Sequence, residues 1–398
     1  MTWVHALAGI ATDFIAKGKR MTDESNSDQL ADDQGPVPNQ DSGDVRVELD
    51  PDGEDAFSYS HSANFPELLT QLQATLVVST YQAGKLVLFR AVDDRLSMLP
   101  RTFDKAMGLA VSRKSISIGT RFQLWNLPNE PILAPRIKPE GTHDACFVPR
   151  DCHVTANIDI HEIAEAGGRM WMVNTLFSCL CTIDPDFSFV PRWQPPFVSR
   201  LIREDRCHLN GMAIADDKPA YVTAFAETDT KEGWRDHKID GGCVIDVGQD
   251  EVIVRGLSMP HSPRVYQNKL WVLDSGTGRL ITVDRSSGEV TSVAELPGYT
   301  RGLAFAGRFA FVGLSQIRET AIFGGVPIAE NLDQRKCGIW VVDIVSGESI
   351  AFIEFQGAVQ EIFDVQLLHG IRFPALIGLE KKTVQRACVI GPLTPIDR

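Results

Sequence analysis

The segment HSPRVYQNKLWVLDSGTGRLITVDRSSGEVTSVAEL, residues 261–296, decides the fold of this chain. Its first half, 261–275, reads as two short strands joined by a tight turn. A third strand, RLITVD (279–284), and a fourth, EVTSVAEL (289–296), follow after short turns. The strands are rich in β-branched and aromatic residues, and Gly, Asp and Ser stand between them. The segment therefore predicts one four-stranded antiparallel sheet.

Similar units recur along the chain at intervals of roughly 50 residues, the period expected of repeat architectures. Segments that fit the same frame are 106–120, 160–175, 209–224, 300–315 and, more loosely, 66–81 and 361–380. Third and fourth strands follow several of them, such as GCVIDV (242–247), GIWVVDI (338–344), EVIVRGL (251–257) and ESIAFIEF (348–355). Four-stranded units repeated at this spacing indicate an all-β fold, a single β-propeller.

The number of blades follows from the number of first strands. Seven units are favoured, and six remain if 66–74 is a helix instead of a strand. The last unit shows only three strands, so a strand from 56–62 is expected to complete it and close the ring. Closure is needed because an open ring would leave two unpaired sheet edges.

Charge is concentrated in a polar segment before the repeats. Residues 21–55 hold twelve Asp and Glu against one Arg, whereas the 398-residue chain has a net charge of −13. Such a segment buries too little apolar surface to order itself, so we predict a disordered acidic tail. The predicted domains are a short helix at 1–20, the tail at 21–55 and the propeller at 56–398. The nearly neutral remainder excludes a basic nucleic-acid footprint.

The ends and the cysteines bear on location. In residues 1–20 the positive charges follow the apolar part, and Asp13 interrupts it, which argues against a secretion signal. No run of about 18 apolar residues predicts a membrane span. The eight Cys are scattered without paired CxxC spacing, which is typical of free thiols. A cytoplasmic protein without membrane contact is expected.

Polar residues recur where the first strands begin, and in a propeller these positions converge on the central axis. The predicted axial set is His161, His208 with Asn210, His261 with Arg264, Arg301, and Glu361 with Asp364. Three imidazoles from different blades suit a transition metal such as zinc, copper or iron, with an open position for water or substrate. His153 is a fourth candidate ligand.

The other axial residues have distinct predicted roles. Arg264 and Arg301 suit an anionic group of a substrate, and Glu361 or Asp364 suits proton transfer. Two insertions, 225–241 and 315–336, are expected on one rim, and Trp234 and Arg235 in the first are candidate ligand contacts. The alternative is an axial network of His, Asn and Arg that satisfies only itself and buried water.

Four stretches resemble a bacterial family of conserved hypothetical proteins with a domain of unknown function. They are LVVSTYQAGKLVLF (76–89), MVNTLFSCLCTID (172–184), DRCHLNGMAI (205–214) and YVTAFAETDTKEGWR (221–235). The resemblance extends over roughly 60–390 and implies a propeller-like domain. More distantly, the repeats are similar to NHL-type and gluconolactonase-like propellers. They are also similar in outline to the peptide-amidating lyase propeller, which implies that His161, His208 and His261 hold a zinc ion.

Two functions fit these observations. The first is a metal-dependent lyase, hydrolase or oxidase that acts on a small or peptide-like anionic substrate at the axis. The second is a non-catalytic propeller that binds a protein or glycan through the rim formed by 225–241 and 315–336.

Overall fold

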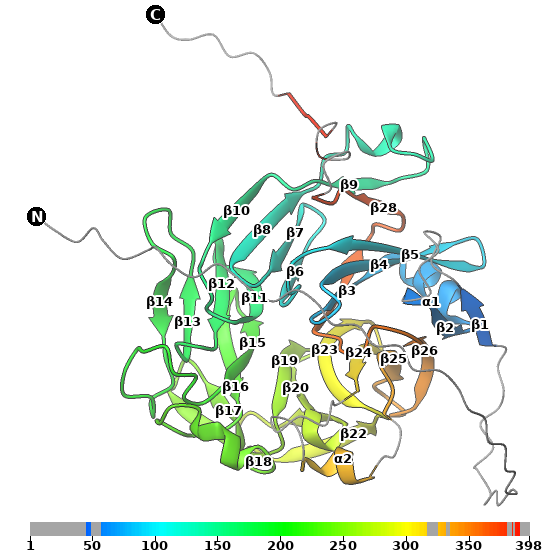
Figure 1. Cartoon of the computed structure of the whole chain (residues 1–398). Coiled ribbons are helices and arrows are strands. Elements are labelled where there is room, and N and C mark those ends of the chain that lie inside the picture. The colour runs from blue at the N-terminus through cyan, green and yellow to red at the C-terminus, as the bar shows by residue number, and fades with distance from the viewer. Residues whose placement is uncertain are drawn as a thin grey trace, which may run out of the picture. The chain divides into compact units, whose positions relative to one another are not determined.

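The computed structural model describes residues 57–316, 325–331, 335–379, 384 and 387–390, and the backbone of 45–48. Residues 43–398 form one compact unit. In it the described residues form six antiparallel sheets arranged as blades around a central axis (Figure 1).

The first three blades come from the first half of the propeller, and their strands follow one another from the axis outward. Blade 1 consists of β27 (Asp364–His369), β3 (Ala74–Thr80), β4 (Lys85–Val92) and β5 (Arg95–Thr102). Blade 2 consists of β6 (Leu109–Val111), β7 (Ser115–Gly119), β8 (Gln123–Pro128) and β10 (Asp151–Val154). Blade 3 consists of β11 (Ile160–Ala166), β12 (Arg169–Asn174), β13 (Cys179–Thr182) and β14 (Val190–Trp193).

The second half of the ring repeats the same order. Blade 4 consists of β15 (Leu209–Ala215), β16 (Lys218–Ala224), β17 (Gly242–Asp246) and β18 (Glu251–Leu257). Blade 5 consists of β19 (Pro260–Tyr266), β20 (Lys269–Asp274), β21 (Arg279–Val283) and β22 (Val290–Glu295). Blade 6 consists of β23 (Tyr299–Ala306), β24 (Phe309–Ser315), β25 (Gly338–Asp343) and β26 (Ser349–Phe355), extended outward by β2 (Tyr59–Ser62) and β1 (Val45–Glu48).

Short elements fill the connections. A parallel pair, β9 (Ala145–Phe147) with β28 (Pro374–Leu376), joins the long β8–β10 connection to the C-terminal part of the chain. The helical elements in the described residues are α1 (Phe65–Leu72), α2 (Pro327–Asn331) and the 3-10 turns η2 (Ala134–Arg136), η3 (Gly233–His237) and η4 (Ser275–Thr277).

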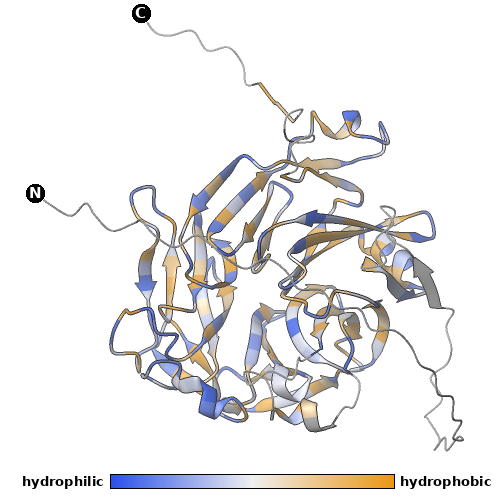
Figure 2. Ribbon diagram, in the orientation of Figure 1, coloured by the Kyte–Doolittle hydropathy of each residue, from blue (hydrophilic) through white to orange (hydrophobic). Residues whose placement is uncertain are grey.

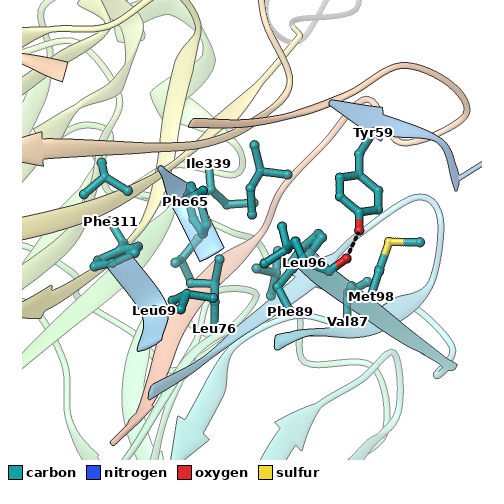
Figure 3. Close-up of a cluster of buried hydrophobic side chains, with 14 of the residues drawn as sticks. Tyr59, Phe65, Leu69, Leu76, Val87, Phe89, Leu96, Met98, Phe311 and Ile339 are labelled. Carbon is teal, nitrogen blue, oxygen red and sulfur yellow. Dashed lines mark hydrogen bonds between the residues drawn. The ribbon is translucent and has the colours of Figure 1, made fainter. Parts of the chain in front are cut away.

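The favoured count of seven blades was wrong, because residues 65–72 form helix α1. Pro66 at the start of the helix suits its first turn, and Phe65, Leu68 and Leu69 are buried on one side. In Figure 3 this side lies among Leu76, Phe89, Phe311 and Ile339, between the first and last blades. An amphipathic helix buries these side chains against both sheets, which a further strand at this place would not do.

Ring closure also differs from the prediction. The C-terminal strand β27 completes the N-terminal blade as its innermost strand, pairing with β3. Strand β2, within the predicted closing segment, instead lies outside β26. Tyr59 of β2 donates a hydrogen bond of 2.9 Å from its hydroxyl to the Leu96 carbonyl (Figure 3). Both ends of the chain therefore tie blade 6 to blade 1.

The core is divided among the junctions between blades. Six clusters of buried apolar side chains each join two neighbouring sheets. Because inner strands such as β3 are buried on both faces, their apolar residues do not alternate strictly with polar ones. Hydrophobic residues accordingly concentrate along the strands and hydrophilic ones in the turns (Figure 2).

The N-terminal predictions fall mostly outside the described residues. Residues 1–44 and 49–56, which include the expected short helix and most of the expected acidic tail, are not among them; 45–48 form strand β1, paired with β2. No helix in the described part of the chain is long and apolar enough to cross a membrane. The cytoplasmic location stays a prediction.

Candidate functional site

A cavity of about 420 Å³ lies at the end of the axial channel where the innermost strands begin. Five of its lining residues were predicted to be axial: His161 on β11, His208 before β15, His261 on β19, Arg301 on β23 and Glu361 before β27. Trp234 and Arg235, from η3 in the insertion 225–241, also line it. The structure therefore brings together seven of the eleven predicted site residues.

Irregular backbone aims these side chains. Asp159, His208 and Met259 each have a left-handed φ, of 56°, 49° and 48°, two residues before His161, Asn210 and His261. The ladder then shifts register beside the channel residue in β11, β15, β19 and β23. Such bulges redirect side chains and cluster next to functional sites.

The left-handed positions also show that the three imidazoles do not occupy equivalent positions in their blades. Asn210, not His208, occupies the position that His161 and His261 occupy in their blades. His208 comes from the left-handed residue two positions earlier. The repeat thus supplies two of the histidines, and the loop before β15 supplies the third.

Each imidazole is held through Nδ1. His161 Nδ1 lies 2.8 Å from Thr175 Oγ1, whose own proton is donated to the Leu209 carbonyl, so the ring is the donor. His208 Nδ1 donates to Asp205 Oδ2 at 2.9 Å. His261 Nδ1 lies 2.9 Å from the Met259 carbonyl. Because all three rings are protonated on Nδ1, each presents the lone pair of Nε2.

The three rings do not form one cluster. His161 and His208 meet edge to face with ring centroids 4.9 Å apart. Phe225 packs against both His208 and His261, with centroids 4.3 and 5.1 Å away. Among the described residues, no three His, Cys, Asp or Glu side chains are arranged to hold a metal ion. The metal stays a prediction.

Burial keeps two of the imidazoles neutral. It lowers the pKa of His161 to about 4, Asp159 opposes this, and His208 and Arg301 add to it. Burial, with Arg301 beside it, also holds the pKa of His261 well below its usual value. At neutral pH both rings are therefore uncharged, with Nε2 free to accept a proton or hydrogen bond.

Asp205 accepts hydrogen bonds from both His208 and Trp234. Its Oδ2 accepts hydrogen bonds from His208 Nδ1 and from Trp234 Nε1, each at 2.9 Å. Burial alone would raise the pKa of Asp205, but the electrostatic interaction with His208 and these two hydrogen bonds lower it overall. The carboxylate therefore stays ionised beside the imidazole.

Arg301 provides a cation in the same cavity. Its guanidinium carbon lies 3.5 Å from the centre of the Phe363 ring, a cation–π contact. Glu361 lies 3.5 Å away, at ion-pair distance. At the rim, Arg235 covers the Trp234 ring and pairs with Glu232 at 3.0 Å.

The other four predicted residues lie elsewhere. Asn210 and Asp364 line a constriction below the cavity, and Arg264 lines a second cavity of about 450 Å³ at the other end of the channel. Arg264 Nη2 pairs with Glu162 at 2.7 Å, and Asp364 accepts backbone hydrogen bonds from Leu109 and Val365. His153 lies on β10, the outermost strand of blade 2, with Nε2 3.0 Å from the Ser188 carbonyl.

Sequence reasoning missed several lining residues, among them Asp159, Asp205, Tyr299 and Phe363. Two had a usable signal. Asp205 precedes His208 by three residues, and Tyr299 precedes Arg301 by two, as Met259 precedes His261. Phe363 had no such signal, because an aromatic residue beside a strand is typical of the hydrophobic core.

Both insertions contribute to one rim, as expected. Phe225 and Trp234 of the first pack with Val326 and Ile328 of the second in one apolar cluster, together with Met259 and Tyr299. Residues 317–324 and 332–334 of the second insertion lie outside the described residues.

Comparison with known protein families agrees with the sequence-based expectation. A family model described as a domain of unknown function (DUF4915) matches residues 63–377, which confirms the predicted resemblance to such a family. No curated protein matches the chain.

Three solved structures have similar folds at low sequence identity. A chain of a nidogen/laminin complex is 10% identical, with a TM-score of 0.48 over 75% of this chain and 99% of that one. A protein of unknown function from Bacteroides caccae is 8% identical, with a TM-score of 0.47 over 74% and 98%. A catalytically inactive virginiamycin B lyase from Staphylococcus aureus, in complex with quinupristin, is 10% identical, with a TM-score of 0.40 over 78% and 99%.

Proposed function

This chain belongs to the DUF4915 family, and we propose that its axial cavity binds a small anionic substrate on which His208 acts as a general base. The observation that carries the proposal is the pair His208–Asp205, which lines the same cavity as Arg301. The pair and the cation come from different blades.

The base is built from His208 and Asp205. When Nε2 of His208 takes a proton from the substrate, the ring becomes positively charged. Nδ1–H then donates to the carboxylate of Asp205 2.9 Å away, which stabilises that charge. Trp234 holds the same oxygen at 2.9 Å and so fixes the orientation of Asp205. Abstraction of a proton in this way serves lyase and hydrolase reactions.

Arg301 is the proposed anchor for the anionic group. In the described part of the chain, the salt bridge to Glu361 at 3.5 Å is its one ion pair. This separation is longer than that of a bidentate guanidinium–carboxylate pair. A substrate carboxylate can therefore bind the guanidinium while Phe363 and Glu361 hold it in place.

The predicted transition metal would replace this base, because an ion bound to Nε2 of His208 would occupy the atom that otherwise accepts the proton. His161 and His208 are the two adjacent imidazoles, and each has Nδ1 already bound, an arrangement that orients metal-ligating histidines. Zinc titration of apo protein tests this. An increase in protein stability on zinc addition that is lost in His161→Gln but kept in His153→Gln would support the ion. An increase that is the same in His161→Gln as in wild type would contradict it.

The alternative, a scaffold that binds a protein or glycan through its rim, has less support. Phe225, Trp234, Val326 and Ile328 are buried together. In the described residues, these four apolar side chains are therefore buried in one cluster beside the cavity, and Ile239 of the first insertion is an exposed large apolar residue.

Metabolite profiling tests the proposed function. The full chain is incubated with a cell-free small-molecule extract, and mass spectrometry identifies compounds that it consumes. We expect wild type and the control His153→Gln to consume one or more compounds that carry a carboxylate, and His208→Gln to leave the same compounds unchanged. Equal consumption by His208→Gln, or none by wild type, would contradict the proposal.

A further inference from the structure

Charge in the axial cavity does not match a simple anion. The described lining residues include two arginines, Arg235 and Arg301, against four carboxylates, Asp159, Asp205, Glu232 and Glu361. Glu232 and Glu361 pair with the two arginines. Asp159 and Asp205 remain, and their basic neighbours are imidazoles.

Asp159 is a carboxylate without a cationic partner among the described residues. Its Oδ2 lies 3.8 Å from Nδ1 of His161, which is beyond hydrogen-bond distance, and that Nδ1 already donates to Thr175 Oγ1 at 2.8 Å. The side chain of Asp159 lines the cavity and is 28% exposed. The chain thus keeps an unneutralised acid at the wall of the cavity.

Asp205 independently indicates that a hydrogen-bond donor is missing from the cavity. The residue lines the cavity and is only 7% exposed. Oδ2 takes both of its hydrogen bonds, whereas Oδ1 is buried and has no hydrogen-bond partner among the described residues. A buried carboxylate oxygen without a donor is costly, so a donor from a ligand would offset that cost.

The walls near these acids are aromatic. The ring of Phe225 lies 4.3 Å from that of His208, and the ring of Trp234 lies 4.4 Å from it. Aromatic faces beside carboxylates attract organic cations. Arg301 stacks on Phe363 and lines the same cavity.

We infer that the ligand is a zwitterion of the amino-acid type: its carboxylate binds Arg301 and its ammonium group binds Asp159 and Asp205. This rests on the proposed function for the anionic half and adds the cationic half. The aromatic lining favours an apolar or aromatic side chain next to the two charges, in a cavity of about 420 Å³.

Three matched probes test the inference by isothermal titration calorimetry with the full chain: L-phenylalanine, 3-phenylpropionate, which lacks the amine, and 2-phenylethylamine, which lacks the carboxylate. We expect the zwitterion to bind about tenfold more tightly than either, since each lost ionic contact is worth about 1.4 kcal/mol on that scale.

Asp159→Asn assigns the amine end. Asparagine tolerates a left-handed φ as aspartate does, so the variant is expected to fold. It should lower the affinity for L-phenylalanine about tenfold and leave the affinity for 3-phenylpropionate unchanged. Asp216→Asn, also at a left-handed position (φ 48°) but outside the cavity, is the control and should change neither.

The outcomes separate the two proposals. If 3-phenylpropionate binds as tightly as L-phenylalanine, the zwitterion is overturned and the anionic site stands. If 2-phenylethylamine binds as tightly as L-phenylalanine, and Arg301→Gln has no effect, the anionic anchor is overturned. If none of the three binds at about 10 mM, weaker than any useful affinity, the zwitterion is overturned, and metabolite profiling still decides the proposed function.

Discussion

The two ends of the axial channel are built from the same innermost strands, yet their charged side chains are paired to different extents. At the upper end, where these strands begin, Arg301 has one carboxylate at 3.5 Å, and Asp205 has an oxygen without a donor among the described residues. At the lower end, Arg264 pairs with Glu162 at 2.7 Å and donates to the Leu303 carbonyl at 3.0 Å.

The backbone explains this difference. The upper residues lie in loops before the innermost strands or, like His161 and His261, near the beginnings of those strands, whereas Glu162 and Arg264 come later in the same strands, β11 and β19. Asp364 accepts hydrogen bonds from backbone groups of Leu109 and Val365. The lower cluster therefore joins blades, and the upper one keeps its polar groups available for a ligand.

The largest effect is expected on chemistry at the upper end. Replacing His208 with Gln removes the base but keeps a polar side chain, and turnover should fall about 10²–10⁴-fold, the usual contribution of a general base. Steady-state rates on a substrate identified by metabolite profiling measure this. A rate within a few-fold of wild type would remove His208 from the mechanism.

At the lower end the same kind of change should act on stability. Arg264→Met leaves Glu162 and Asp364 buried without a counter-charge, which costs about 3–5 kcal/mol of unfolding free energy. Urea denaturation measures it. Adding Glu162→Gln should recover part of the loss, since one uncompensated charge is removed.

An unchanged denaturation midpoint in Arg264→Met would show that the lower cluster does not hold the blades together. The comparison between the two ends would then fail.

The pH dependence of stability should report on His161. Its folded pKa of about 4 is below the ordinary value of 6.5. Between these values the unfolded chain binds more protons, so stability is lost as pH falls through this window. Wild type should lose on the order of 2 kcal/mol more than His161→Gln from pH 6.5 to 4. Parallel urea profiles for the two proteins would contradict a neutral buried imidazole.

The smallest expected effect is the stability change from Arg301→Gln. A single ion pair at 3.5 Å is lost, and Phe363 keeps its contacts with Tyr81 and His161. The free energy of unfolding should fall by less than in Arg264→Met, because the ion pair is longer (3.5 against 2.7 Å) and Glu361 is more exposed than Glu162. Urea denaturation of both variants makes the comparison, and equal losses would place Arg301 in the framework of the fold.

Much of the fold follows from local patterns in the chain. Short β-branched segments with Gly, Asp and Ser turns between them predicted the pairs β15–β16 and β19–β20 and the outer strands of blades 4 to 6. The segment 65–72 was ambiguous, because eight residues with Leu at helical and strand-compatible positions fit either structure. Its packing between blades 6 and 1 decided for the helix.

The candidate site divides in the same way. The recurrence of polar residues at strand beginnings pointed to His161, His261 and Arg301, and an insertion pointed to Trp234. Position in the repeat did not separate His208 from Asn210, or Arg301 from Arg264, because the bulges that aim them are not visible in residue types. His153 has the same side chain as His161, yet its strand is the outermost of its blade.

The sequence alone therefore determined a closed ring of small sheets with polar groups at its axis, because strand periodicity and turn chemistry are local properties. Tertiary structure decided the six-fold count, the closure by β27 and the division of the axial charges between two ends. Those depend on contacts between residues 285 positions apart, such as Ser79 with Asp364, and on bulges of a residue or two. No local pattern carries that information.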